Sequence, residues 1–251
     1  MFGIMLLVLI YLSTTLVFRL GIWGTGICQV LILLVPLVYA WYMKADFKKL
    51  FSLHIPKIRH ILGGIFLWVG VFCLEQVVLV LLSDVFPSLT ETSASLNASI
   101  LDAGFLPALL VVGITPAIAE EFAFRGFLFG TIKEKNKITV AIIVSAIVFG
   151  VYHMNLLQFF GGLMMGIALA YACHRSGSIW VGAMMHFINN GLGVVLQYYP
   201  KIIQSVPVIS KERYGLSDYL IRVAVGAATV AIGILFMNCG KKKIEKQSET
   251  A

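Results

Sequence analysis

Charged residues are scarce in this sequence. Asp, Glu, Lys and Arg together make up 12% of the 251 residues, whereas they make up about a quarter of a soluble globular domain. Hydrophobic residues account for 59% of the chain, and the mean hydropathy is +0.94. This composition excludes a soluble globular domain and predicts an all-α fold, a polytopic bundle of transmembrane helices.

Paired cysteines are also absent. The four cysteines are isolated in the sequence, and none has the spacing of a zinc or redox motif; they are Cys28, Cys73, Cys173 and Cys239. We interpret all four as apolar helix residues.

The sequence has no feature that would divide the chain into separate domains. There is no repeat, low-complexity segment or domain linker, so residues 1–240 are predicted to form a single integral membrane domain. The N-terminal apolar run lacks the leading basic stretch and the small-residue cleavage site of a signal peptide. We therefore expect this run to be a retained transmembrane helix.

Eight apolar runs are long enough to cross a bilayer, since a spanning helix needs about 20 mainly apolar residues. The predicted spans are Phe2–Phe18, Gly26–Met43, Ile61–Leu82, Phe105–Ile132, Ile138–Met154, Leu156–Cys173, Ile179–Tyr198 and Tyr219–Met237. Only Asn155 separates the fifth span from the sixth.

The basic residues predict the orientation of the bundle. Lys and Arg gather between spans two and three, four and five, and six and seven, and in the tail of residues 241–251. The loop Ser83–Gly104 has none, and the exceptions are Arg19, Lys201, Lys211 and Arg213. By the positive-inside rule both termini are predicted to be cytoplasmic. Because the basic residues flank apolar runs, the net charge of +7 indicates contact with the lipid bilayer and not with nucleic acid.

Polar side chains inside the spans are the candidate functional residues. Span four holds Glu120, Glu121 and Arg125, and a charge at bilayer depth costs at least about 2.5 kcal/mol even on insertion scales. Such groups favour a functional site over a purely structural ion-pair knot. Span five ends at His153, and span seven holds His186 and Asn190; the structural alternative for these is interhelical hydrogen bonding. Glu75 and Arg222 are interpreted as structural.

Helical spacing predicts how these side chains face. Glu121 and Arg125 are four residues apart in the order that favours an ion pair. Glu120 lies about 100° around the helix from Glu121 and is predicted to face a cavity. His186 and Asn190 share one face of span seven. With a rise of about 1.5 Å per residue, these groups and His153 fall in one layer of the membrane and can converge on a single pocket.

Such a pocket suits hydrolysis of a peptide or amide bond. A carboxylate and an imidazole that share a water form a general-base site. A second imidazole with a carboxamide can stabilise the oxyanion that forms when water attacks a carbonyl. No serine or cysteine lies in a nucleophile motif, so we expect no covalent intermediate.

A metal site is the alternative use of the same groups. Glu120, His153 and His186 could bind Zn²⁺, with water in the fourth position. The His-Glu-x-x-His motif of many zinc proteases is absent, and a site that requires no cofactor is the preferred interpretation.

Three motifs occur in a specific order on these spans. They are Glu120-Glu121-x-x-x-Arg125, Phe149-x-x-x-His153 and His186-x-x-x-Asn190. In this order they resemble the CPBP family of intramembrane proteases, the type II CAAX-prenyl-endopeptidase-like or Abi proteins. The resemblance covers about residues 105–198, the predicted catalytic core, and implies an eight-helix membrane enzyme whose site opens toward the cytoplasm.

The resemblance also implies roles for the site residues. By analogy with the eukaryotic CAAX-processing relatives, Glu120 and His153 would activate water, His186 and Asn190 would stabilise the oxyanion, and Glu121 and Arg125 would support them. The family is named both as metalloprotease and as metal-free glutamate hydrolase, and the sequence leaves both open.

The expected function is therefore an intramembrane endopeptidase that acts on a membrane-associated peptide or protein. Because bacterial members of the family are often linked to bacteriocin self-immunity or peptide maturation, the expected location is a bacterial plasma membrane. The alternative is a non-catalytic immunity protein or a proton-coupled transporter that uses the same polar pocket.

Overall fold

The computed structural model describes residues 15–16, 19–87, 94–205 and 215–239. Within these residues the protein is a bundle of helices, which confirms the predicted fold class. Six helices in this part of the chain are long and apolar enough to cross a membrane: α2 (Ile22–Tyr42), α4 (Ile58–Val85), a composite helix over Phe105–Lys135, α11 (Leu156–Ser176), α12 (Ile179–Tyr198) and α14 (Leu216–Asn238).

A seventh apolar helix, α10 (Ile138–Tyr152), is shorter. These seven helices correspond to predicted spans two to eight. The predicted first span, Phe2–Phe18, lies almost entirely outside the described residues, as does the predicted basic tail of residues 241–251. The total of eight spans therefore stays a prediction. The remaining helices are short: α3 (Phe47–Leu50), α6 (Ala94–Asp102) and α13 (Pro200–Ser205).

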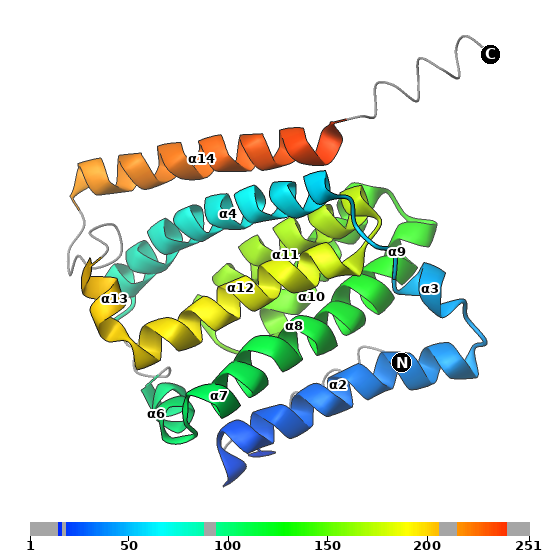
Figure 1. Cartoon of the computed structure of the whole chain (residues 1–251), viewed down its shortest axis with the longest axis horizontal. Helices are drawn as coiled ribbons and strands as arrows, with labels where there is room; N and C mark the ends of the chain where they lie inside the picture. The colour runs from blue at the N-terminus through cyan, green and yellow to red at the C-terminus, as the bar shows by residue number, and fades with distance from the viewer. Residues whose placement is uncertain (1–14, 17–18, 88–93, 206–214, 240–251) are drawn as a thin grey trace.

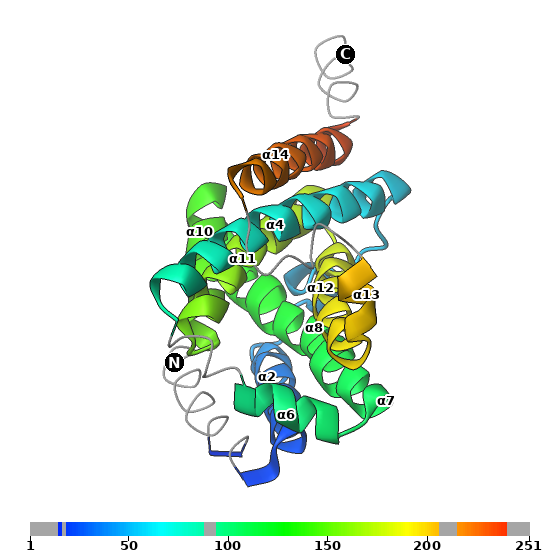
Figure 2. The same ribbon diagram turned by 90° about the vertical axis from the view of Figure 1, so that its left-hand side faces the viewer.

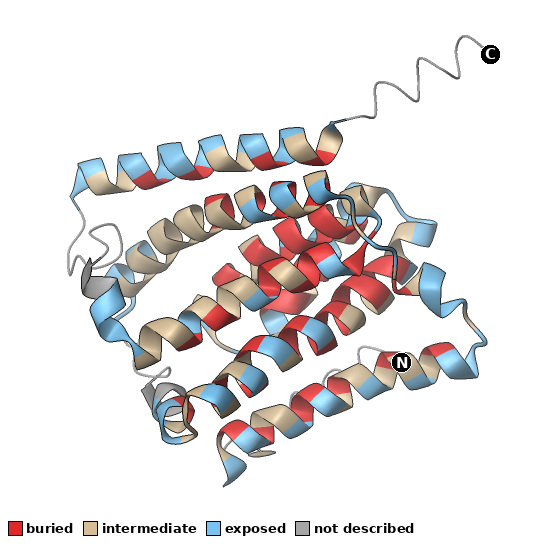
Figure 3. Cartoon of the chain, in the orientation of Figure 1, coloured by how far each residue is buried: buried red, intermediate tan, exposed pale blue. Residues whose placement is uncertain are grey.

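The helices form layers (Figures 1 and 2). Helix α14 lies along α4 at one edge of the bundle, α2 lies at the opposite edge, and α11 and α12 occupy the middle. Buried residues concentrate in the central helices, whereas α2 and α14 turn exposed faces outward (Figure 3). Those faces carry exposed aliphatic side chains such as Val38 and Leu235. Apolar outer faces are what a bilayer requires of the helices that border it.

The composite helix is interrupted by two π-helical segments. It consists of α7 (Phe105–Ala108), η1 (Leu109–Ile114), α8 (Thr115–Glu120), η2 (Glu121–Leu128) and α9 (Phe129–Lys135), and both η segments are π-helical. In a π-helix each N–H bonds the carbonyl five residues back, and such turns are frequent at functional sites. The assumption of 3.6 residues per turn through Glu120 and Arg125 is therefore wrong from Glu121 onward.

Proline explains part of the irregular winding. Pro116 has no N–H, so the carbonyls one turn before it lose a backbone donor. Side chains take over at this point. The Thr115 hydroxyl donates to the Val111 carbonyl at 2.8 Å, and the Asn190 amide donates to the Val112 carbonyl at 3.1 Å. These side-chain donors matter in lipid, because an unsatisfied backbone group there costs about 2–7 kcal/mol by transfer data.

Glycines allow α4 and α14 to approach closely. Gly63 and Gly70 on α4 face Gly233 and Gly226 on α14, so each helix presents two glycines seven residues apart. A Cβ added at Gly70 would lie 2.6 Å from Val230 Cγ2 and 2.8 Å from the Gly226 carbonyl oxygen. Small residues at such positions let helix backbones pack against one another in the absence of a hydrophobic driving force.

We expect the substitution Gly70→Val to destabilise the bundle by about 1–3 kcal/mol, the usual cost of overpacking a close contact. The unfolding midpoint of the purified protein in mixed detergent micelles would measure this loss. Gly193→Ala is the matched control, because a Cβ at that exposed helical position meets open space. Equal stability of the two variants would contradict the proposed close packing.

Candidate active site

A buried ion pair forms the base of the site. Glu121 Oε1 lies 3.0 Å from Arg125 Nη1, and neither side chain is exposed. The Arg125 guanidinium carbon also lies 4.2 Å from the centre of the Phe149 ring, and Nη2 donates to the Gly166 carbonyl at 3.4 Å. The predicted Glu121–Arg125 pair is confirmed, and it ties the composite helix to both α10 and α11.

His186 lies between the two carboxylates. Its Nδ1 is 3.1 Å from Glu121 Oε1, and its Nε2 is 3.7 Å from Glu120 Oε2. Because an ionised carboxylate only accepts hydrogen bonds, Nδ1 carries a hydrogen and donates it to Glu121. The structure thus brings both adjacent acids to one imidazole, each on a different ring nitrogen.

Glu120 is held by a residue that the sequence analysis did not single out. Gln29 Nε2 on α2 donates to Glu120 Oε1 at 2.6 Å, and both side chains are buried. Glu120 Oε2 has no hydrogen-bond partner among the described residues. Gln29 is an isolated carboxamide in the apolar run of α2, and that isolation is the signal that could have identified it.

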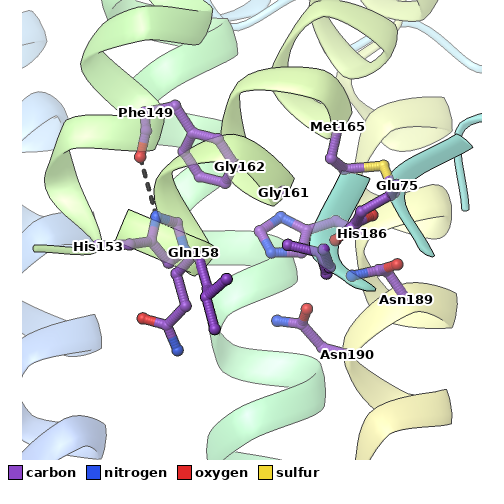
Figure 4. A pocket seen from close by; sticks show the side chains of 12 residues that line it. Glu75, Phe149, His153, Gln158, Gly161, Gly162, Met165, His186, Asn189 and Asn190 are labelled. Carbon is purple, nitrogen blue, oxygen red and sulfur yellow. Dashed lines mark hydrogen bonds between the residues drawn. The ribbon is translucent and has the colours of Figure 1, made fainter. Parts of the chain in front are cut away.

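A cavity of about 370 Å³ opens in front of this cluster. Its walls come from α4, α10, α11 and α12, and Figure 4 shows the side chains that line it. They are Glu75, Leu79, Phe149, His153, Leu157, Gln158, Gly161, Gly162, Met165, His186, Asn189 and Asn190. Three of the four predicted catalytic residues line this one cavity. The fourth, Glu120, is not among the lining residues and contacts His186, which is.

His153 lies at the end of α10, and the Phe149 ring packs edge-on against both His153 and His186. The ring centre of Phe149 is 4.9 Å from that of His153 and 5.7 Å from that of His186. His153 Nδ1 lies 2.9 Å from the Phe149 carbonyl oxygen (Figure 4). Since a carbonyl only accepts, Nδ1 carries the hydrogen, and in the neutral ring Nε2 is left as an acceptor.

The chain turns sharply after His153. Met154 adopts a left-handed conformation with a φ of 52°, which costs about 1–3 kcal/mol for a residue with a side chain. The Asn155 side chain then caps α11 by accepting from the backbone N–H groups of Leu157 and Gln158 at 2.9 and 3.2 Å. This turn places His153 at the rim of the cavity and confirms the predicted separation of spans five and six.

Asn190 donates a hydrogen bond to the backbone of the composite helix and also lines the cavity. One amide hydrogen goes to the Val112 carbonyl, as described above, which leaves the second hydrogen and the amide oxygen for the cavity. The predicted shared face of His186 and Asn190 is confirmed, because both side chains line the cavity.

Glu75 of α4 also lies on the cavity wall. From the sequence it was interpreted as a structural residue. Its neighbour on the wall, Asn189, accepts a hydrogen bond from Trp68 Nε1 at 3.3 Å. The signal for Glu75 was its ionisable side chain within an apolar span, since such residues are functional candidates by default.

The predicted zinc ligands do not form a metal site in this arrangement. Within the part of the chain that the structure describes, no group of three or more His, Cys, Asp or Glu side chains is placed so that it could hold a metal ion. The contact of His186 Nδ1 with Glu121 does not itself argue against zinc, because metal-binding histidines commonly donate their other ring N–H to a carboxylate.

Comparison with protein families agrees with these motifs. Residues 102–192 match the model of the type II CAAX prenyl endopeptidase Rce1-like family. The similarity to this family is confined to that segment, which is less than half of the chain. The segment contains Glu120, Glu121, Arg125, His153, His186 and Asn190, whereas Gln29 and Glu75 lie outside it.

A curated relative matches a stretch of similar length. It is a protein of Bacillus subtilis (strain 168) named "Putative membrane peptidase YdiL", which is 32% identical over 92 residues. The alignment takes in 37% of this chain and 38% of that protein, well under two thirds of either. No solved structure matches the chain.

We expect Arg125→Met to reduce the free energy of unfolding by about 3–5 kcal/mol, because it leaves the Glu121 charge buried without its guanidinium. Detergent unfolding would measure the loss. The double variant Glu121→Gln/Arg125→Met should recover part of it, and Glu134→Gln on the exposed face of α9 should change little. A single Arg125→Met variant as stable as the wild type would contradict the buried pair as described.

Proposed function

We propose that this protein is an intramembrane peptidase that hydrolyses a peptide bond in a membrane-associated peptide or protein. The observation that carries the proposal is the His186 imidazole, held between two buried carboxylates on the wall of a cavity that it shares with His153 and Asn190. The family whose model residues 102–192 match supports the same activity.

Glu120 is the proposed general base. Its Oε2 has no hydrogen-bond partner among the described residues, so it is available to a water molecule. His153 presents Nε2 as an acceptor from the other side of the cavity, because its Nδ1 is occupied by the Phe149 carbonyl. Glu120 and His153 make no contact with each other in the described structure, and the proposal requires one water to bridge them. Glu120 would take a proton from that water as it attacks and return it to the leaving amine.

His186 and Asn190 are the proposed oxyanion donors. As an oxyanion donor His186 would carry a hydrogen on Nε2, the ring nitrogen that Glu121 does not contact, and would donate it to the carbonyl oxygen of a substrate. Asn190 offers the amide hydrogen that Val112 does not use. Two such donors, fixed in place before the reaction, stabilise the negative charge that develops on the oxygen. Glu121 and Arg125 act as positioning residues, since they hold the His186 ring through Nδ1.

The membrane orientation and the biological role are also proposals. The α3–α4 loop lies beside the α11–α12 turn, where Leu53 and Ser178 form a β-bridge, and Gly130 of α9 lies close to the Leu50 carbonyl. The basic loops thus gather at one end of the bundle, which supports cytoplasmic termini by the positive-inside rule. A bacterial plasma membrane and a role in bacteriocin maturation or self-immunity fit the family resemblance, and a neighbouring gene for a double-glycine leader peptide would support that role.

We expect Glu120→Gln to lower turnover by a factor of about 10² or more, because general-base catalysis contributes that much. Cleavage of a farnesylated CaaX peptide and of a bacteriocin precursor peptide by the purified variant would measure the loss, with a melting curve to show that folding is retained. Glu134→Gln on exposed α9 is the matched control and should keep full turnover. Unchanged turnover in Glu120→Gln would remove Glu120 as the base.

The second candidate is a proton-coupled transporter or a non-catalytic immunity protein. The observation that favours it is the chain of Glu120, His186 and Glu121, since linked acids and imidazoles also form proton relays in membranes. Proton flux into liposomes by the wild type, absent in Glu120→Gln, together with no peptide cleavage, would select the transporter.

We also propose that catalysis needs no metal, because no three His, Cys, Asp or Glu side chains of the described residues are placed to hold an ion together. Turnover is expected to survive prolonged dialysis against EDTA and 1,10-phenanthroline, with elemental analysis of the protein as the accompanying measurement. Loss of turnover on chelation, and its return with one equivalent of Zn²⁺, would establish the metallo-endopeptidase alternative with Glu120, His153 and His186 as first candidates for ligands.

A further inference from the structure

We propose that Glu75 is a specificity-determining residue that binds a positively charged group of the substrate, an amino or guanidino group, beside the bond that is cleaved. The inference rests on the proposed peptidase function and adds the chemistry of the substrate to it. Four features of the cavity support it.

One oxygen of the Glu75 carboxylate has no partner in the part of the chain that the structure describes. Glu75 lies midway along α4 and lines the cavity. Its Oε2 is buried and has no hydrogen-bond partner among the described residues. A buried polar atom without a partner is costly, and the cost is far larger for an ionised carboxylate unless a cation accompanies it. A cationic group in the cavity would therefore interact favourably with this oxygen.

The facing helix leaves room for this carboxylate. A Cβ built on Gly161 of α11 would lie 2.5 Å from Glu75 Oε1, closer than such atoms can approach. Gly161 thus allows the acid to occupy its position against α11. Any larger residue at this position would push the carboxylate away from the α11 wall.

The cavity wall supplies no permanent cation to Glu75. The side chains that line it within the described structure include two histidines but no Lys or Arg. Arg125 is buried against Glu121 and Phe149. Figure 4 shows Met165, His186 and Asn189 near Glu75. A permanent cation that pairs with Glu75 must therefore arrive with a ligand.

The position of Glu75 suits a role in substrate selection. It does not suit a role in the reaction that members of the family have in common. Helix α4 lies outside residues 102–192, the segment that carries the family motifs. Glu75 nevertheless lies in the same cavity as His153, His186 and Asn190 (Figure 4). A cationic group held there would place the adjoining peptide backbone beside these side chains. In surroundings this apolar, a charged substrate group is rejected unless an opposite charge receives it.

The first test compares paired peptides. Apolar quenched-fluorescent peptides would carry one Lys at successive positions around the cleaved bond, each matched by a peptide with Nε-acetyl-lysine. The wild type should favour Lys over acetyl-lysine at one position by about tenfold or more in kcat/KM, the effect of one hydrogen-bonded charge pair. Glu75→Gln should lose that preference and still cleave the acetyl-lysine peptide. Glu134→Gln should keep the preference.

A shorter acid provides a second variant. Glu75→Asp keeps the charge and moves it back by one methylene, so it should retain a reduced preference for Lys. If Glu75→Gln fails to fold, this variant still decides the matter. A full preference for Lys in Glu75→Gln, or no preference at any position in the wild type, would overturn the proposal and leave Glu75 as a protonated structural group.

A binding measurement separates this proposal from the peptidase proposal. The probe is n-butylammonium, with n-butanol as the uncharged control, observed by saturation-transfer NMR on the full chain in detergent. The ammonium should bind the wild type and Glu120→Gln equally and should not bind Glu75→Gln. If no peptide is cleaved by the wild type, the peptidase function fails while this experiment still judges Glu75. Equal binding of the ammonium to all three proteins would overturn the Glu75 assignment.

Discussion

The buried contact of Glu121 with Arg125 and His186 is the interaction around which the other helices are arranged. It joins the composite helix to α12 directly, to α10 through the Phe149 ring, and to α11 through the Gly166 carbonyl. In lipid there is no hydrophobic force to bring helices together, so polar contacts and close packing specify which faces meet. The same contacts that assemble the bundle therefore also orient the imidazole on which its chemistry depends.

The site is divided into a dry part and an open part. The Glu120 and Glu121 carboxylates and the Arg125 guanidinium lie in the dry part, where Glu121 pairs with Arg125 and Glu120 accepts from Gln29. His153, Asn190 and Glu75 lie around the cavity, where polar atoms remain available. His186 belongs to both, since one nitrogen contacts Glu121 and the other lies between Glu120 and the cavity. This division keeps the ion pair away from both water and lipid while polar atoms remain available in the cavity at membrane depth.

Much of this arrangement could be predicted from the sequence, because charge is so rare that each polar residue in a span is informative. The bounds of α12 agree with the prediction to the residue, and the predicted Glu121–Arg125 pair forms although its segment is π-helical. The direction of Glu120 could not be predicted, since a π-helical segment begins at Glu121 and alters the angle between neighbours. Gln29 and Glu75 were missed because each stands alone in its span. No spacing rule applies to a single residue, and only the packing of α2 and α4 shows what each one faces.

The length of α10 has a consequence for the surrounding bilayer. Its 15 residues extend over roughly 22 Å, less than the hydrocarbon thickness of about 30 Å. The tight turn at Met154 and Asn155 then sends the chain straight back as α11. A bilayer accommodates so short a span by local thinning, by snorkelling of flanking side chains or by oligomerisation, at a cost of a fraction of a kcal/mol per ångström of mismatch, about 0.1–1 in magnitude. Local thinning at this end of α10 would shorten the path by which water enters from that face.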